Sequence, residues 1–270
     1  MLKSALLGIL FACWSLGAAA EAVGRIDLLL GEVSILDSKA KSRAPRLGDA
    51  VQEGDTITTG KEGEIHLSFE DGSVLALRPD AQVQIVSFRA KGKANDGSVV
   101  ALLRGTLRAI TGLLGRRKAE SVLVRTPTAT IGIRGTDHEA AVIPPGSDLG
   151  EPGTYDKVNA GGTRITSRLG SVDVSPGQAG FAPHAAAPVV LPAIPAFFVP
   201  READQRLEGV NDRLQRAPEA RAGTGKPAGG KGGTQIQGNT RINATASNVN
   251  AVATGSDNKA ANRIGTIGGD

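Results

Sequence analysis

The stretch EIHLSFEDGSVLAL, residues 64–77, decides the fold class. In its first six residues, apolar side chains alternate with His66 and Ser68, which predicts a half-buried β-strand with both polar side chains on the solvent face. The Asp71-Gly72 pair that follows tolerates positive φ and predicts the tip of a hairpin. Residues 74–77 supply the return strand, so the stretch indicates antiparallel β-structure.

The same rhythm continues on both sides of this hairpin. Gly, Pro, Asp and Asn recur about every eight to twelve residues, with short β-branched or alternating apolar runs between them, a spacing typical of all-β domains. The 36 glycines and 3% aromatic residues argue against one large core through all 270 residues. We therefore expect one all-β domain over residues 25–182, built of short strands as a sandwich or β-roll.

Residues 1–20 have the three parts of an export signal. A short positive start precedes an apolar run over residues 5–16, and Ala18-Ala19-Ala20 supplies the small side chains that a signal peptidase needs. The run is shorter than the ~20 residues that span a membrane. We expect cleavage after residue 20, no stable membrane insertion afterwards, and a periplasmic or secreted protein. A retained anchor, or lipidation at the single cysteine Cys13, is the weaker alternative.

The composition changes after the β domain. Five prolines interrupt residues 183–200, a segment expected to lie extended against the domain or to act as a spacer. Residues 201–217 place apolar side chains at helical spacing and predict a short amphipathic helix. Residues 218–233 predict a glycine-rich linker. Residues 234–270 are rich in Asn and Ala, which favours disorder, with self-association through added strands as the alternative.

Several short motifs follow one another through the β domain. They are LGD at 47–49, GDTITTG at 54–60, LSFEDGS at 67–73, LRGTL at 103–107, VRTPTATIGIRGTD at 124–137, LGSVDV at 169–174 and PGQ at 176–178. Each motif alone is ordinary turn chemistry. In this order and spacing they resemble the FecR domain family, over a region from about Gly24 to Ala182.

The resemblance implies an exported β domain of the kind found in signalling proteins and in cell-envelope proteins with sugar-binding or peptidoglycan-binding modules. In the regulator of iron-citrate uptake that gives the family its name, such a periplasmic domain senses an outer-membrane transporter, and a cytoplasmic N-terminal segment controls a sigma factor. Only Met1-Leu2-Lys3 precede the apolar run of this chain. We therefore expect something other than a complete transmembrane regulator. The resemblance supplies no catalytic residue and no cofactor.

The polar residues and glycines of these motifs are the candidate site residues. Paired acids beside an arginine could serve hydrolysis, but an aspartate next to a glycine is a typical cap of backbone N–H groups. A structural role is therefore favoured over catalysis, and we do not expect an enzyme. The residues assigned this role are Gly54, Asp55, Asp71, Gly72, Arg134, Gly135, Thr136 and Asp137.

Arg134 is the member of this set expected to matter most for stability. It follows the alternating Ile131 and Ile133, so its stem should lie against apolar neighbours while its guanidinium reaches a carbonyl or carboxylate. Asp71 and Asp55 are the two carboxylates considered as its partner. We expect a partly buried charged pair.

No metal site is expected. Asp137-His138-Glu139 is the densest group of metal-capable residues, but successive residues of a strand point to opposite faces. His66 and His184 are expected to be solvated.

Basic residues form two clusters in or near predicted turns, where solvation is expected. The net charge of +4 is too small and too dispersed for a dedicated nucleic-acid-binding protein. The clusters contain Lys39, Lys41, Arg43 and Arg46, and Arg104, Arg108, Arg116, Arg117 and Lys118. Of these, Arg116-Arg117-Lys118 is the densest group and the candidate contact for an anionic partner.

The sequence therefore predicts an exported, non-enzymatic FecR-type β module that binds an envelope protein or a cell-wall glycan, in signalling or scaffolding. The alternative is a structural or surface-adhesive protein that assembles through its Asn/Ala-rich tail.

Overall fold

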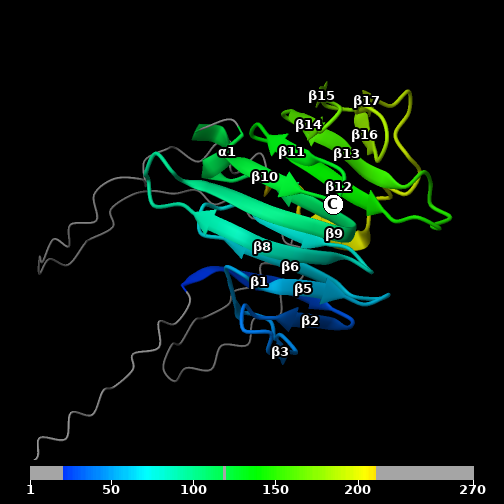
Figure 1. Ribbon diagram of the computed structural model, residues 1–270. Coiled ribbons are helices and arrows are strands. Elements are labelled where there is room, and N and C mark those ends of the chain that lie inside the picture. The colour runs from blue at the N-terminus through cyan, green and yellow to red at the C-terminus, as the bar shows by residue number, and fades with distance from the viewer. Residues whose placement is uncertain (1–20, 118–119, 211–270) are drawn as a thin grey trace, which may run out of the picture. The chain divides into compact units, whose positions relative to one another are not determined.

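The computed structural model describes residues 21–117 and 120–210, which are built almost entirely from strands. The seventeen strands in these residues share one hydrogen-bonded network. Within it, two runs of strands, here called sheet A and sheet B, meet at the long strand β9 (Gly97–Ile110) (Figure 1). The all-β class expected from the sequence is confirmed.

Within the described residues, sheet A contains nine strands, including the part of β9 that pairs with β7 (Val74–Leu77) and β12 (Asp137–Ile143). In order of pairing, its strands are β4 (Ala50–Gln52), β1 (Ala22–Leu30), β6 (Glu64–Phe69), β7 (Val74–Leu77), β9 (Gly97–Ile110), β12 (Asp137–Ile143), β13 (Gly153–Ala160), β16 (Ala179–Pro183) and β17 (Val189–Val190). All pairs in this sheet are antiparallel.

Sheet B contains the remaining strands. In order, they are β3 (Ser42–Arg43), β2 (Val33–Leu36), β5 (Thr56–Thr59), β8 (Gln82–Arg89), β9, β10 (Val122–Arg125), β11 (Thr130–Ile133), β14 (Thr163–Ser167) and β15 (Gly170–Val174). The β9–β10 pair is parallel. A short helix, α1 (Leu113–Arg117), lies in the chain between these two strands.

Strand β9 belongs to both sheets because it changes partners along its 14 residues. Residues 97–104 pair with β8 in sheet B, whereas residues 105–110 pair with β12 in sheet A. Gly105 stands at this change with φ = +77°. A Cβ atom there would lie 2.6 Å from the Cα of Ala81. Only glycine therefore allows β9 to pass this close to the backbone of Asp80 and Ala81.

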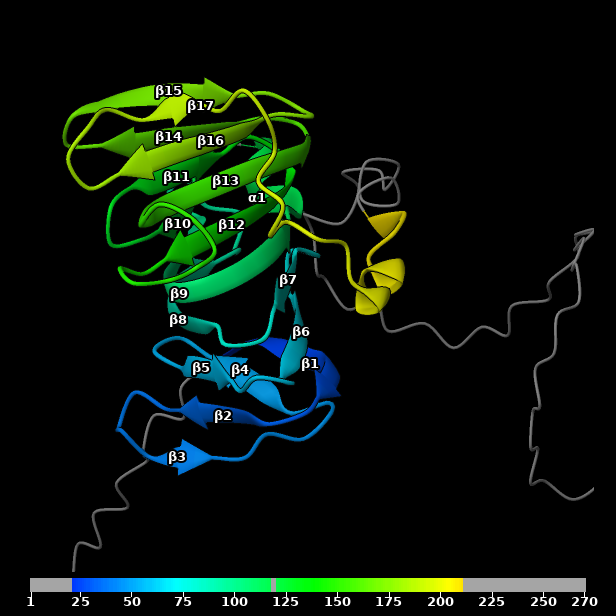
Figure 2. The same cartoon turned by 90° about the vertical axis from the view of Figure 1, so that its right-hand side faces the viewer.

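One hydrophobic core lies between the two sheets. It takes Ile65, Leu67 and Leu77 from sheet A and Ile57 and Leu102 from sheet B, all fully buried. Because one face of each sheet supplies these side chains, the sheets pack face to face. Figure 2 shows the two sets of strands beside each other.

The hairpin over residues 64–77 forms as predicted. β6 and β7 pair with Ser68 opposite Val74, and Gly72 at the tip has φ = +83°. The expectation that β6 is half-buried, with His66 in solvent, is wrong. His66 is buried because a C-terminal segment of the chain covers this face of sheet A.

We call residues 191–210 the strap. It starts after β17 and contains a 3₁₀-helix, η1 (Glu202–Arg206), where the sequence predicted an amphipathic helix over 201–217. Residues 183–200 lie against the domain, since β17 pairs with β16 and Phe198 is buried. The sequence interpretations of residues 1–20 and 211–270, and of Lys118, lie outside the described residues.

We predict that Gly105→Ala destabilises the domain more than Gly177→Ala does. Both glycines have φ = +77°, but a Cβ at Gly177 meets nothing within 4 Å. The control should lose ~1–2 kcal/mol from its positive φ alone, and Gly105→Ala should lose a further ~1–3 kcal/mol from overpacking against Ala81. Urea unfolding followed by far-UV circular dichroism measures both losses. Equal losses would contradict the role given to Gly105.

Candidate functional site

The outer face of sheet A carries charged side chains in a cross-strand row. In order across five strands, the row contains His66, Ala76, Arg108, Glu139 and Lys157. Arg108, Glu139 and Lys157 are direct neighbours of alternating sign, so each attracts the next. Lys157 Nζ lies 2.8 Å from Glu139 Oε1.

Arg78, which follows β7 directly, lies at the centre of this charged face and is only 5% exposed. Its Nη1 donates to Glu64 Oε1 at 3.2 Å, and its Nη2 donates to Asp204 Oδ1 at 2.6 Å. Glu139 Oε2 lies 3.7 Å from the same Nη2. Three carboxylates from distant parts of the chain therefore surround one guanidinium.

The charges of this network balance. Arg108 donates to both oxygens of Asp137, at 2.9 and 2.6 Å, and its Nη1 lies 3.5 Å from Asp204 Oδ1. The cations are Arg78, Arg108, Lys157 and Arg201, and the anions are Glu64, Asp137, Glu139 and Asp204. Because a buried charge is tolerated only when it is paired, this balance allows the face to be covered.

The strap covers this face with three anchoring side chains. Phe198 packs in a cluster with Tyr155 and Phe181, and Leu207 packs on Ala76 and Ile110. Between these anchors, Asp204 enters the charged network. Figure 2 shows the strap beside sheet A, on the side away from sheet B.

Two carboxyl groups of the charged network, Glu64 on sheet A and Asp204 on the strap, have pKa values below their ordinary values. Burial alone raises the pKa of Glu64, but a hydrogen bond with His66 and the charges of Arg78 and Arg201 outweigh it. Burial alone also raises the pKa of Asp204. The backbone N–H of Arg201 and the charges of Arg78 and Arg108 lower that pKa by more. The network therefore favours the ionised form of both groups.

A cavity of about 550 Å³ opens between the strap and sheet A. Arg78, Glu139 and Thr106 line it from the sheet side, and Arg201 from the strap. Two other lining residues, Leu149 and Val199, are 62% and 61% exposed. Large apolar side chains exposed beside paired charges form a surface suited to a ligand with both apolar and polar groups.

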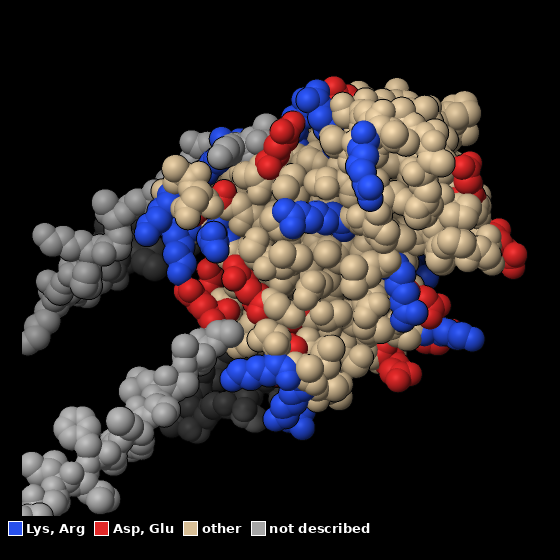
Figure 3. Space-filling view, in the orientation of Figure 1, with Lys and Arg blue, Asp and Glu red and all other residues tan. Residues whose placement is uncertain are grey.

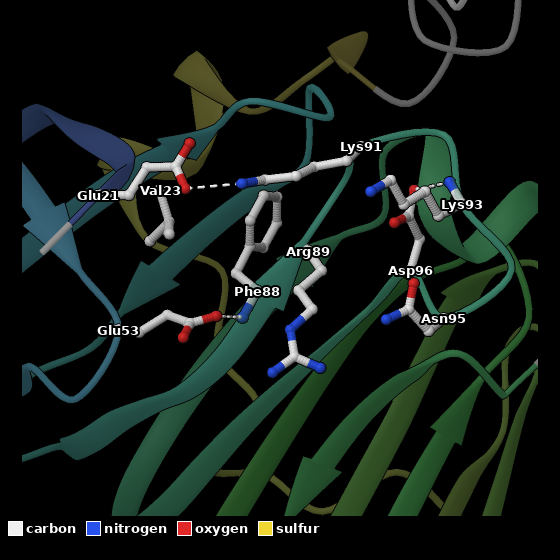
Figure 4. A pocket seen from close by; sticks show the side chains of 9 residues that line it. All are labelled: Glu21, Val23, Glu53, Phe88, Arg89, Lys91, Lys93, Asn95 and Asp96. Atoms are coloured by element: carbon white, nitrogen blue, oxygen red, sulfur yellow. Dashed lines mark hydrogen bonds and ion pairs between the residues drawn. The ribbon is translucent and has the colours of Figure 1, made fainter.

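A second pocket, of about 450 Å³, lies between the start of β1 and the β8–β9 hairpin (Figure 4). Lys91 Nζ lies 2.8 Å from Glu21 Oε2 across its upper side, and Glu53 Oε1 accepts the N–H of Phe88 at 2.6 Å. The pocket is lined by Glu21, Val23, Glu53, Phe88, Arg89, Lys91, Lys93, Asn95 and Asp96. With three cations and three anions among these residues, its charge selects neither an anionic nor a cationic ligand.

The outer face of sheet B differs from that of sheet A. Figure 3, seen from this side, shows a largely uncharged surface with charged side chains gathered mainly toward its margins. A hollow of about 370 Å³ on it is lined by Glu120, Leu123, Thr130, Gly132, Arg164, Thr166 and Ser171. Gly132 leaves space there because it has no side chain.

The structure does not bring the predicted site residues together. Asp55 accepts hydrogen bonds from the Gln52 N–H at 3.1 Å and from Arg43 at 3.3 Å. Asp71 accepts the N–H of Ser73 at 2.9 Å, and it lies in the turn after β6. Both aspartates therefore organise local turns. Gly54 and Gly72 have φ values of +89° and +83° beside them.

The predicted partner of Arg134 is wrong. Arg134 donates to Asp173 at 2.6 Å, and its side chain is 40% exposed. β11 ends at Ile133, whose side chain faces the core, and successive residues of an extended chain point to opposite faces, so Arg134 points to the outer face of sheet B. Arg134 is therefore a surface residue and not the centre of a buried pair.

The other predicted site residues differ from Arg134 in burial. Thr136 is fully buried, and its N–H lies 3.2 Å from the Thr111 hydroxyl oxygen. Asp137 is buried and belongs to the charged network. Arg116 and Arg117 end the helix α1, where Arg117 is exposed.

His138 faces the core and does not share a site with Asp137 or Glu139. Its Nδ1 lies 2.6 Å from Asp156 Oδ1, with both side chains fully buried. Among the described residues, no group of three or more His, Cys, Asp and Glu side chains is arranged to hold a metal ion.

Sequence reasoning missed the charged network because its members lie on separate strands. Arg108 was expected to be solvated, but it is largely buried against Asp137. One signal could have found part of the network. Glu64, Arg108, Glu139 and Lys157 occupy positions of their strands whose side chains point away from the core, and a sheet with a long row of such charges is a candidate for a covered face.

The fold and site define a two-sheet all-β domain with one outer face covered by its own C-terminal strap. The family model described as FecR protein matches residues 55–148, so the chain carries a FecR domain, as its motifs indicated. The match runs from just before β5 to just after β12 and includes all of β9.

Parts of the chain are similar to solved structures. The chain is similar to a proposed anti-sigma factor from Parabacteroides distasonis ATCC 8503, with 13% identity over 52% of this chain and 60% of that one, and a TM-score of 0.42. It is also similar to a structure described as a cell surface anchoring domain, with 31% identity over 24% of this chain and 86% of that one, and a TM-score of 0.24. No curated protein matches the chain. Within residues 21–117 and 120–210, no helix is long and apolar enough to cross a membrane.

We predict that Arg78→Ala destabilises the domain severely, whereas Arg134→Ala leaves the urea midpoint close to that of the wild type. Removing the Arg78 guanidinium leaves Glu64 and Asp204 buried without a main partner, which should cost on the order of 3 to 5 kcal/mol. The exposed Arg134–Asp173 pair is screened by water. Urea unfolding of both variants measures the difference, and similar midpoints for the two variants would contradict this assignment.

We predict that acidification weakens the domain through Glu64 and Asp204. Because both pKa values are lower in the folded state, their contribution is complete above the ordinary carboxyl pKa of about 4, and it is lost as pH falls from there toward the folded values. Urea midpoints between pH 6 and pH 2.5 should fall on acidification, and less steeply in Asp204→Asn. An identical slope in that variant would show that Asp204 does not contribute.

Proposed function

We propose that the protein is an exported, non-enzymatic FecR-domain module that binds a partner protein in the cell envelope, in signalling or scaffolding. The observation that carries this proposal is the cavity beside the strap, with its exposed apolar rim and its paired charges. Its charged groups are engaged with one another, so their charges balance. The FecR domain supports a role in the envelope.

A protein partner suits this cavity better than a glycan does. The lining side chains Leu149, Val199, Phe197 and Ile143 are apolar, so they match apolar side chains of a peptide. The Glu139 carboxylate and Arg78 guanidinium beneath them suit the polar groups of a polypeptide. A cell-wall glycan is the competing partner, because the resemblance to the FecR domain family also implies envelope proteins with sugar-binding modules.

The test is capture of partners by the tagged full chain produced in its own cells and recovered from envelope fractions. Intact mass should show a chain beginning at Glu21. We predict that Leu149→Asp reduces partner capture at least tenfold, because a carboxylate at the rim opposes apolar contact. The control, Leu169→Asp, alters a similarly exposed leucine, 55% exposed, in the β14–β15 turn, and it should capture normally.

Three results would contradict the proposal. They are equal capture by Leu149→Asp and wild type, loss of capture in both variants, and retention of residues 1–20 in the recovered chain. Capture that disappears after muramidase digestion of the extract would assign the cavity to a cell-wall glycan and overturn the protein partner.

A further inference from the structure

The strap is attached to sheet A by side chains. Leu191 donates its N–H to Ala179 at 2.8 Å, and this is the last backbone–backbone hydrogen bond from the strap to the sheet within the described residues. Backbone bonds over residues 192–210 stay inside the strap, as between Asp204 and Arg201 or Leu207 and Asp204. The strap is therefore held as a bound peptide is held, by a few side chains in matching sites.

Three sites on the sheet receive these side chains. Phe198 is buried in the aromatic cluster, Asp204 lies between two arginines, and Leu207 is buried on the surface of β7 and β9. Beside the site that receives Asp204, Arg201 Nε of the strap donates to Glu64 Oε2 at 3.1 Å. The strap thus presents an aromatic, an acidic and an aliphatic anchor, with spacings of six and three residues.

The two arginines that receive Asp204, Arg78 and Arg108, are held in place without the strap. Arg108 is fixed by two hydrogen bonds to Asp137, and Arg78 by its bond to Glu64. None of these three bonds involves the strap. The two guanidinium groups would therefore keep their positions if Asp204 left, and a preorganised site loses little entropy when it binds another carboxylate.

We propose that the outer face of sheet A is a peptide-recognition surface that the strap occupies within its own chain, and that a partner protein's segment of the same chemistry displaces the strap. The segment carries an aromatic residue, an acidic residue six positions later and an aliphatic residue three positions after that. This goes beyond the proposed function, which requires only that the cavity bind a ligand. Because Phe197, Val199 and Arg201 of the strap line that cavity, a cavity ligand holds the strap in place, whereas a displacing segment removes it.

The experiment uses a fluorescein-labelled synthetic peptide with the sequence of residues 195–210 as the probe. The proteins are the full chain and a weakened-strap variant, Phe198→Ala with Leu207→Ala, which alters strap residues and leaves the three sheet sites intact. Fluorescence anisotropy should show binding to the variant at least tenfold tighter than to the wild type, because the wild-type strap competes. A peptide with Asp204→Asn should bind the variant at least tenfold more weakly.

Far-UV circular dichroism checks that the variant is folded. If it is not, the single variant Leu207→Ala replaces it with the same two peptides. The proposal is overturned if neither peptide binds the folded variant, if wild type and variant bind equally, or if Asp204→Asn in the peptide has no effect. None of these results depends on partner capture by Leu149→Asp, so the proposed function and this inference can fail separately.

Discussion

The bend of β9 at Gly105 is the constraint on which the rest of the structure depends. On one side of the bend, β9 completes sheet B with β8 and β10, and on the other it joins β7 to β12 in sheet A. The backbone of Asp80 and Ala81 passes so close to Gly105 that a side chain has no room there. The bend places Leu102 and Leu107 in the same core, and it also aims Arg108 at the outer face of sheet A.

Both faces of sheet A are covered, and this explains the unusual burial of its polar residues. All seven residues of β12 are buried although the strand begins with Asp137, His138 and Glu139. His138 points into the core and pairs with Asp156, while Asp137 and Glu139 lie under the strap. Charges in such positions are tolerated because each has a partner of opposite sign. The strap adds partners for other charges of this face, Asp204 for Arg78 and Arg108 and Arg201 for Glu64.

The arrangement supports the proposal that the domain binds a partner protein. Its charged groups stabilise one another, and two exposed apolar side chains, Leu149 and Val199, line a cavity formed partly by the strap. A surface covered by a segment with few backbone attachments can exist in two states, covered and open, whose balance a ligand shifts according to which state it binds. The FecR domain supports the proposal of a role in envelope signalling.

The sequence by itself determined the all-β class, the hairpin over residues 64–77 and the FecR domain. These properties follow from alternation and turn residues, which act between neighbours along the chain. The sequence did not assign Arg134 to Asp173, because the two residues lie 39 positions apart and meet only when β11, β14 and β15 pair in sheet B. Nor could it bring Arg78 to Asp204, which lies 126 residues away. Only the tertiary structure decided which face of sheet A the strap covers, because burial of a strand's second face depends on contacts between distant segments that no local pattern encodes.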